Sequence, residues 1–463
     1  MPSDKPLERT IYVGPFVHSK TFDELELCED GAIGVDEKGK ITFVDRHGTG
    51  VSNRPGWESA KVVRISGKGF FFPGFIGPDS HIHASQYPNL GIFGKSTLLD
   101  WLQTYTFPLE GSFSDLEKAR KIYNRVVART LANGTTTAAY YATIHVPATN
   151  LLADICQTRG QRAFVGRVCM NSTLSPDYYR DESAEQAIKA SRECIEHVKK
   201  IDPANELISH IITPRFAPSC TKESLKMLGD LHRETGVPCQ THISENKNEC
   251  ELVKELYPES KSYAGVYDDA GLLTDKMILA HAVHLTQEEK ELIRDRKSKI
   301  SHCPASNTAI TSGCCRVREL MDTGIDVGLG TDVSGGFSPS ILEVTRQAIW
   351  VSRHIAMHEG DHVKLSTEEA LYLATRGGAK VVGLEDKIGG FDVGKEFDAQ
   401  MVRLDEVQDG DDELDDEDGP VDIFGNESFE NTVAKWVYNG NHQNTVAVWV
   451  KGRLVHQTKK FAA

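Results

Sequence analysis

The chain has 463 residues, of which 39% are hydrophobic and 26% charged, and its formal net charge is −15. This length predicts one large domain with a smaller one beside it, and the acidic balance argues against a nucleic-acid partner bound through a basic surface. No apolar run is long enough to span a bilayer, and residues 1–5 do not resemble a signal peptide. We therefore expect a cytoplasmic protein with no membrane partner.

The ten cysteines are scattered and form no Cys-x-x-Cys pair, so we interpret them as reduced and mostly buried side chains. Cys303 has no recognisable base beside it and is expected to be structural. The negative charge is concentrated in residues 405–418, which include no basic residue. We predict a solvated surface loop there, because such a run of like charges cannot be buried. A calcium site is disfavoured, because the spacing fits no calcium-binding loop.

The first part of the chain, residues 9–75, is predicted to be rich in β-strand. Short apolar segments at 32–36 and 41–45 flank a Glu-Lys-Gly-Lys turn, which indicates a β-hairpin. Further strands are expected at 11–13 and 61–65.

From Ile76 to about Gly378, strand-like and helix-like segments alternate. Capping boxes that begin with Ser114, Thr286 and Ser366 mark three helix starts, and the first of these helices is expected to end at Asn133-Gly134. Eight apolar segments read as strands: 70–83, 135–141, 163–168, 207–213, 237–242, 277–281, 299–303 and 325–330. This alternation predicts an α/β protein with a (β/α)8 TIM-type barrel.

After about residue 385 the pattern becomes strand-like again, at 394–402 and at 445–455. The simplest arrangement joins both ends of the chain in one small β-sandwich domain. We therefore expect residues 1–75 and 385–463 to form this composite β domain, and residues 76–384 to form the barrel.

Residues that bind metals occur at the ends of several predicted strands. His81 and His83 lie two residues apart at the end of the first strand, so their side chains point to the same side. His242, His281 and Asp332 end the fifth, sixth and eighth strands. A barrel places its active site at these carboxyl ends, so the sequence predicts one metal site there.

Several imidazoles with one carboxylate suit Zn²⁺, and Fe²⁺ is also possible; we expect one ion per chain. An open coordination position would hold a water whose pKa falls to about 7. Glu245 lies three residues beyond His242, close enough to move a proton, and Asp332 is placed to orient the water and accept its proton. These are the parts of metal-assisted hydrolysis.

Longer motifs strengthen this interpretation. The chain contains Pro73-Gly74 before Asp79-Ser80-His81-Ile82-His83, and also His242-Ile243-Ser244-Glu245, Ser301-His302-Cys303-Pro304 and Gly330-Thr331-Asp332. Together they resemble the amidohydrolase superfamily. Within it, His83-Ala84-Ser85-Gln86-Tyr87, Trp101 to Pro108 and Pro214-Arg215-Phe216 are similar to stretches of the guanine deaminase family.

The resemblance implies hydrolytic deamination of guanine to xanthine and ammonia, in purine catabolism, by an enzyme that is commonly a homodimer. It assigns the metal positions to His81, His83, His242, His281 and Asp332. It assigns contacts with the purine to Ala84, Ser85, Gln86, Tyr87, Arg215, Phe216, His242 and Asp332. The catalytic roles fall to Glu245, Asp332 and His281, with Glu245 protonating the ring nitrogen and then the leaving amine.

One departure from the superfamily pattern is the extra pair Gly77-Pro78 before Asp79. Proline removes a donor from the strand ladder, and two added residues require a bulge or an earlier loop. We therefore expect an irregularity next to His81 and His83.

Other readings of the same residues remain open. The barrel could serve a different mononuclear amidohydrolase, a deaminase or chlorohydrolase of another nitrogen heterocycle, or a scaffold without activity. A two-metal site is disfavoured because residues 207–216 contain no lysine. His302 is equally compatible with lining the pocket and with forming a hydrogen bond that supports a pocket residue. Trp101 is compatible with a packing role and with a role as a pocket lid.

Overall fold

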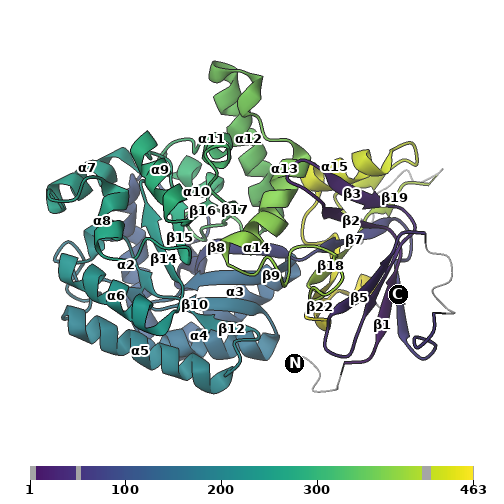
Figure 1. Ribbon diagram of the computed structural model, residues 1–463, viewed down its shortest axis with the longest axis horizontal. Helices are drawn as coiled ribbons and strands as arrows, with labels where there is room; N and C mark the ends of the chain where they lie inside the picture. Colours follow the sequence, from purple (N-terminus) through teal and green to yellow (C-terminus); the bar gives the residue numbers. More distant parts are fainter. Residues whose placement is uncertain (1–6, 48–53, 409–418, 462–463) are drawn as a thin grey trace.

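The computed structural model describes residues 7–47, 54–408 and 419–461, with residues 78–82 described by their backbone alone. The elements nearest the two ends of the chain, purple and yellow in Figure 1, lie together on one side of the molecule. The blue and green strands and helices of the middle of the chain lie on the other side.

The middle of the chain contains two four-stranded parallel sheets. One has the order β12-β10-β9-β8, and its strands are Ile208–His210, Arg162–Gly166, Thr135–Tyr141 and Phe75–His83. The other has the order β14-β15-β16-β17, with strands Cys239–Ile243, Met277–His281, Lys299–His302 and Val327–Leu329. A parallel bridge between Ile212 and Cys239 links the two sheets at one edge, and β17 lies against β8 at the other. No hydrogen-bonded ladder between β17 and β8 is seen in the described backbone.

A strand therefore forms in each of the eight predicted segments, and the α/β class is confirmed. Helices separate the strands: α3 Leu116–Ala132, α4 Val146–Arg159, α5 Ala184–Ile201, α6 Lys222–Thr235, α7 Lys247–Leu256, α8 Tyr263–Asp269, α9 Gln287–Asp295, α10 Pro304–Ala309, α11 Val317–Asp322, α12 Ile341–Glu359, α13 Thr367–Tyr372 and α14 Gly378–Val381. Short helices α1 (Leu98–Trp101) and α2 (Phe107–Gly111) follow β8.

The predicted capping boxes at Thr286 and Ser366 are confirmed at the starts of α9 and α13. The prediction for Ser114 was wrong, because Asp115 caps α3. The Asp115 carboxylate accepts the backbone N–H groups of Glu117 at 2.9 Å and Lys118 at 3.1 Å. An ionised carboxylate is the stronger acceptor for these N–H groups, since it also interacts favourably with the positive end of the helix dipole.

The two ends of the chain build two further sheets. A six-stranded sheet has the order β22-β21-β18-β7-β2-β3, with strands Arg453–Gln457, Thr445–Val450, Ala399–Arg403, Gly69–Pro73, Phe16–Ser19 and Leu25–Cys28. A four-stranded sheet has the order β5-β4-β1-β6, with strands Ile41–Asp45, Ala32–Val35, Thr10–Val13 and Lys61–Arg64. Both sheets contribute to one hydrophobic core, in which Tyr12 stacks on Phe397 at 4.1 Å. Helix α15 (Phe429–Asn439) precedes β21.

The predicted opening strand, 70–83, is two strands that belong to different sheets. β7 ends at Pro73 in the six-stranded sheet, and β8 begins at Phe75 in the first parallel sheet. Gly74 lies between them, where its N–H donates to the carbonyl oxygen of Asp398 at 2.9 Å. A Cβ at this position would lie 2.2 Å from the Thr136 side chain, so the close approach requires glycine.

The irregularity expected at Gly77-Pro78 is confirmed. Gly77 pairs with Ala138, and the pairing resumes only with Ile82 opposite Tyr140 and His83 opposite Tyr141. Residues 78–81 thus stand opposite Ala139 alone, which makes a bulge. His83 returns to regular register beyond the bulge.

Three sequence expectations concern the periphery of the fold. Within the described ranges, no helix combines the length and apolarity needed to cross a bilayer. The cysteines of the described chain remain thiols. The first two residues of the predicted acidic loop, Asp405–Glu406, form strand β19 instead, which pairs with β20 (Asp422–Ile423). Residues 409–418 of the predicted loop lie outside the described residues.

Candidate active site

A pocket lies at the carboxyl ends of the parallel strands. Its polar lining comes from residues on or just after β8, β14, β15 and β17 and from the segments after β13 (Thr213–Pro214) and β16. The lining residues are His83, Arg215, His242, Glu245, His281, Ser306 and Asp332, with Leu98, Trp101, Leu102, Phe216 and Ile310 as the apolar part. The strand-end position predicted from the sequence is therefore where the structure gathers these side chains.

Three histidines form a row across this pocket. The ring centres of His83 and His242 are 5.7 Å apart, and those of His242 and His281 are 5.5 Å apart. The rings are nearly parallel, with interplanar angles of 29° and 16°. Three separate strands thus bring three imidazoles side by side.

Each imidazole of the row has its Nδ1 held by an oxygen. Nδ1 of His83 lies 3.1 Å from Glu110 Oε1, and Nδ1 of His281 lies 2.8 Å from Asn307 Oδ1. Nδ1 of His242 donates to the carbonyl oxygen of Arg215. Because such oxygens accept and do not donate, Nδ1 carries the proton and Nε2 keeps its lone pair, which is the tautomer that binds a metal.

The protonation of the row also suits a divalent cation. Burial lowers the pKa of His83, and burial together with the neighbouring His281 and His83 lowers the pKa of His242 well below its ordinary value. Neutral imidazoles with a nearby carboxylate, Asp332, match the donor preferences of Zn²⁺ and Fe²⁺. Among the described side chains, no three His, Cys, Asp or Glu are arranged as a finished cation site. The side chain of the predicted ligand His81 lies outside the described residues.

Glu110, which the sequence analysis missed, binds the His83 end of the row. Its fully buried carboxylate accepts from Gln86 Nε2 at 2.6 Å, from Tyr179 Oη at 2.7 Å and from Arg215 Nη1 at 2.7 Å. Burial raises the pKa of Glu110, but Arg215 and His83 more than reverse that effect and lower the pKa to about 2. Glu110 is therefore ionised.

A sequence signal for Glu110 did exist. It is the only charged residue in the otherwise apolar and small stretch 106–114, two residues beyond the Trp101 to Pro108 motif. A lone acid in such a stretch needs a buried partner.

Glu245 binds the opposite end of the row. Its Oε2 lies 3.5 Å from Nε2 of His281, and Ser312 Oγ donates to its Oε1 at 3.3 Å. Burial and then the negative charges of Asp332 and Glu249 raise the pKa of Glu245 well above its ordinary value. The raised pKa favours the protonated form of Glu245, which is the form that can donate a proton into the pocket.

Asp332 follows β17 in the left-handed region, with φ of 44°, a conformation that aspartate tolerates better than most residues. Its backbone carbonyl accepts the N–H of Gly336. A Cβ at Gly335 would lie 2.5 Å from Asp332 Oδ2, so glycine is needed for the carboxylate to occupy this position.

The predicted pair Arg215 and Phe216 also lines the pocket. The Phe216 ring centre lies 6.2 Å from that of His242, in an edge-to-face arrangement. The Arg215 guanidinium lies over the ring of Phe107 at 5.1 Å and is bonded to Glu110 through both terminal nitrogens.

The four predicted purine-contacting residues after His83 are placed differently. They lie in a short 3-10 helix, Ala84–Asn89, and although all four are described, none of them lines the pocket. Ser85 Oγ donates to the carbonyl oxygen of Ala142 at 3.1 Å, Ala84 is packed in a hydrophobic cluster, and Tyr87 packs against that cluster. Gln86 reaches the site through Glu110.

Two residues with open assignments can now be placed. Trp101 lines the pocket from α1. His302 lines a separate cavity with Cys315, Val317 and Leu365, and burial lowers its pKa to about 3.

Comparison with known proteins gives a consistent picture. The model of the amidohydrolase family matches residues 70–455. A Schizosaccharomyces pombe protein called probable guanine deaminase is 48% identical over 451 residues, covering 96% of this chain and 83% of its own length. Dictyostelium discoideum guanine deaminase is 42% identical over 455 residues, covering 96% of this chain and 98% of its own.

Among solved structures, guanine deaminase from C. acetobutylicum with guanine bound in the active site matches with a TM-score of 0.86. It is 33% identical and covers 97% of this chain and 100% of its own. The chain described here belongs to the amidohydrolase family. Its curated relatives over nearly the whole length carry the name guanine deaminase.

Proposed function

We propose that this protein is a guanine deaminase, which hydrolyses guanine to xanthine and ammonia. The observation that carries the proposal is the buried Glu245 at the end of a row of three imidazoles, in a pocket also lined by Arg215 and Phe216. An acid, a carboxylate and a set of metal-type donors are the parts that hydrolytic deamination requires. The names of the relatives over nearly the whole chain support guanine as the substrate.

The metal site of this proposal consists of His81, His83, His242, His281 and Asp332, which would hold one Zn²⁺ per chain, with Fe²⁺ as the alternative. When bound, the ion supplies a water molecule whose pKa is lowered to about 7. The tautomers of His83, His242 and His281, each fixed through Nδ1, support this assignment.

The protein side chains then divide the proton transfers. Asp332 accepts the proton of the attacking water and orients it towards the carbon that bears the amino group. Glu245, whose raised pKa favours its protonated form, protonates the adjacent ring nitrogen; it then takes up the proton of the newly added hydroxyl group and gives it to the leaving amine. Return of the proton from Asp332 to Glu245 restores both groups. The third catalytic residue of this scheme is His281, whose Nε2 lies 3.5 Å from Glu245 Oε2.

The purine itself would be held by residues around the histidine row. Phe216 offers a ring for stacking, and Arg215 offers donors for the acceptor edge of the base. Leu98, Trp101 and Leu102 form an apolar wall that excludes water. The purine contacts of Ala84, Ser85, Gln86 and Tyr87 stay a proposal by resemblance; of these four, Gln86 is joined to the pocket lining indirectly, through Glu110 and Arg215.

The finer points of architecture are also proposals. We infer that the two parallel sheets are halves of one (β/α)8 barrel spanning residues 76–384, supported by the Ile212–Cys239 bridge and the contact of β17 with β8. The sheets of residues 1–75 and 385–463 would form a β-sandwich, supported by their shared core. A homodimer is proposed by resemblance, and a cytoplasmic location because no apolar run is long enough to span a bilayer; light scattering of the purified protein tests the dimer.

One experiment separates the candidate functions. Purified protein is assayed with guanine, other purines, pterins and triazines, and its metal content is measured. We expect turnover of guanine with about one Zn²⁺ or Fe²⁺ per chain. Turnover of another heterocycle with guanine inert contradicts the substrate assignment. No turnover with markedly less than one ion per chain indicates a scaffold without activity.

A further inference from the structure

Several hydrogen-bond donors surround the carboxylate of Glu110, a residue that belongs to none of the strand-end motifs. Oε2 accepts from Tyr179 and Arg215 Nη1, both at 2.7 Å. Oε1 accepts from Gln86 at 2.6 Å, lies 3.1 Å from His83 Nδ1 and also faces Arg215 Nη2 at 3.3 Å. A carboxylate offers about four lone-pair positions, so these donors saturate it and leave no capacity for proton transfer to a substrate.

We propose that Glu110 is a positioning residue that holds the purine-reading residues Arg215 and Gln86 and the metal-binding residue His83 on one shared buried carboxylate. The inference rests on the proposed function, because it assigns purine contacts to Arg215 and Gln86. Glu110 does not line the pocket, so it acts through the residues that it binds.

Arg215 depends on Glu110 for its orientation. Its guanidinium is 1% exposed, and a buried charge is tolerated only with a partner. Glu110 binds both terminal nitrogens, which fixes the plane of the guanidinium. The remaining N–H groups therefore point in defined directions, which is the condition for recognising one edge of a base.

Gln86 is oriented by the same carboxylate. Its Nε2 donates to Glu110, so its Oε1 must face away, where Ser334 Oγ lies at 3.5 Å. Turning the amide over would place its oxygen against Glu110 Oε1, so that two acceptors would face each other. Glu110 therefore decides which end of the Gln86 amide is the acceptor.

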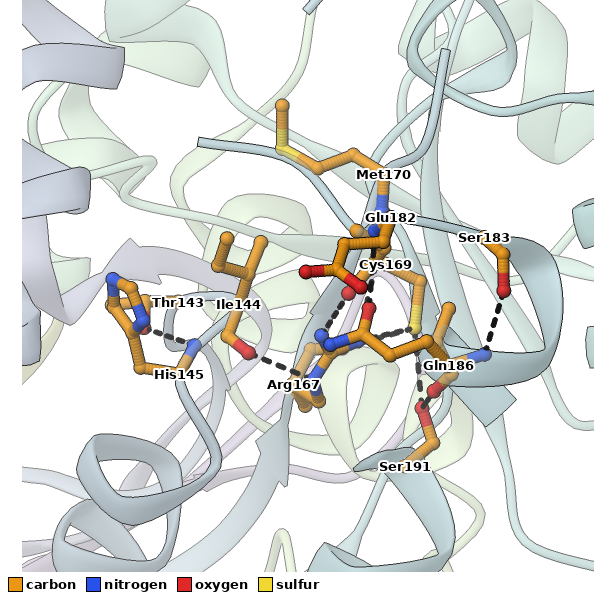
Figure 2. A network of polar contacts seen from close by, with 12 residues as sticks. Thr143, Ile144, His145, Arg167, Cys169, Met170, Glu182, Ser183, Gln186 and Ser191 are labelled. Carbon is orange, nitrogen blue, oxygen red and sulfur yellow. Dashed lines mark hydrogen bonds and ion pairs between the residues drawn. The ribbon is translucent and has the colours of Figure 1, made fainter. Parts of the chain in front are cut away.

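Glu110 is in turn held by a loop with its own anchor. Tyr179 lies in the loop between β11 (Val168–Cys169) and α5, and Asp181 of this loop pairs with the buried Arg167. Figure 2 shows Arg167 at the centre of this network, donating to the carbonyl oxygen of Ile144 at 2.9 Å. The N–H of Met170 donates to Asp181 at 3.0 Å, which closes the loop base. These contacts hold the loop in the conformation in which the Tyr179 hydroxyl donates to Glu110.

The test uses Glu110→Gln, since an amide of the same shape cannot accept from all these donors. In metal-free protein, titration calorimetry with xanthine is expected to show a Kd raised about 10- to 100-fold, because charge-assisted contacts to the reading residues lose their alignment. In the same variant, chelator competition is expected to show Zn²⁺ affinity reduced about 10- to 100-fold through His83.

Two controls separate a shared anchor from general damage. Asn307→Ala removes the oxygen that holds Nδ1 of His281, so it should weaken Zn²⁺ binding while the xanthine Kd of metal-free protein stays within about twofold. Glu289→Gln changes another buried carboxylate, one that caps α9 far from the pocket lining, and should leave both constants within about twofold.

A double-mutant cycle with Arg215→Gln completes the test. Glu110 acts through Arg215, so the two substitutions should not be independent. The sum of the xanthine-affinity losses in the two single variants should be larger than the loss in the double variant. Additive losses, or a folded Glu110→Gln protein with unchanged xanthine and Zn²⁺ affinities, overturn the proposal. If that variant does not fold, Glu110→Asp, which keeps the charge but shortens the reach, is held to the same outcomes. Failure of the parent protein to deaminate guanine would instead contradict the proposed function.

Discussion

The two ends of the histidine row carry the same residue type in opposite states. Glu110 at the His83 end and Glu245 at the His281 end are both buried, yet the pKa of Glu110 falls to about 2 and that of Glu245 rises well above its ordinary value. Burial raises the pKa in both cases. The difference comes from the neighbours, because Glu110 faces the Arg215 cation whereas Glu245 faces the carboxylates of Asp332 and Glu249.

This contrast shows how one site keeps a fixed anion at one end of the histidine row and a proton donor at the other. The anion orients side chains and cannot give up a proton that it does not hold. The neutral acid holds a proton and has few donors around it that would stabilise its ionised form. Substitutions at or near Glu110 and Glu245 therefore test the two states separately.

The largest effect is expected from Glu245→Gln. The amide keeps the shape but cannot donate a proton to the ring nitrogen in the same way, so kcat should fall about 10²- to 10⁴-fold. Xanthine binding should change little. Steady-state assays with guanine measure the loss. His284→Ala is the control: Nε2 of His284 donates to the backbone carbonyl oxygen of Ser312 at 2.7 Å, outside the pocket lining, so kcat should be retained within a few-fold.

Glu110→Gln is expected to destabilise the fold at neutral pH by about 3–5 kcal/mol, since it leaves the buried Arg215 charge without its partner. The folded-state pKa of Glu110 lies below the ordinary value of 4.5, so its stabilising contribution is present above pH 4.5 and lost as the pH falls towards about 2. Urea unfolding of both proteins should therefore show a difference that shrinks over this range. A constant difference across that window would contradict the ionised state of Glu110.

Glu245→Gln should have the opposite effect on stability. The folded-state pKa of Glu245 is raised, so its contribution is fully present below pH 4.5 and is lost as the pH rises towards the folded-state pKa. Glutamine avoids this loss, and the variant should gain about 1.4 kcal/mol per pH unit over that interval. Unfolding of metal-free protein from pH 4.5 to 8 measures it. A stability difference between variant and parent that stays constant over this pH range would contradict the raised pKa of Glu245.

A smaller effect is expected at Gly335. An alanine Cβ would meet Asp332 Oδ2 and Ser306 Oγ at 2.5 Å, so Gly335→Ala should displace the carboxylate and lower kcat/KM for guanine about tenfold, the typical result of a small misplacement in a site. Gly265→Ala is the control, because its nearest neighbour, Ser262 Oγ, is at 3.3 Å and lies outside the pocket lining. An unchanged kcat/KM in Gly335→Ala would remove Asp332 from the reaction scheme.

Much of the parallel framework was predictable from local pattern. The eight strand segments were found because apolar runs of strand length, bounded by turns and helix caps, depend on neighbours in sequence. The break at Gly74 was missed although the run from Phe70 to Ile76 contains Pro73-Gly74, a pair that often interrupts a strand. The contacts of Gly74 with Asp398 and Thr136, which are distant in sequence, show that the chain changes sheets there.

The candidate site was predictable in part. His83, His242, Glu245, His281 and Asp332 were found because each follows a strand whose carboxyl end points to one common face. Arg215 and Phe216 came from resemblance and also line the pocket. Glu110 and Asn307 were missed because they lie on helices without a motif.

The sequence by itself determined which strands form, which side chains end them and therefore which chemical groups meet. The tertiary structure alone decided the state of those groups. Two glutamates with the same intrinsic acidity differ because folding places a guanidinium beside one and two carboxylates beside the other, and electrostatic energies depend on those distances in space, which a linear spacing of residues does not contain.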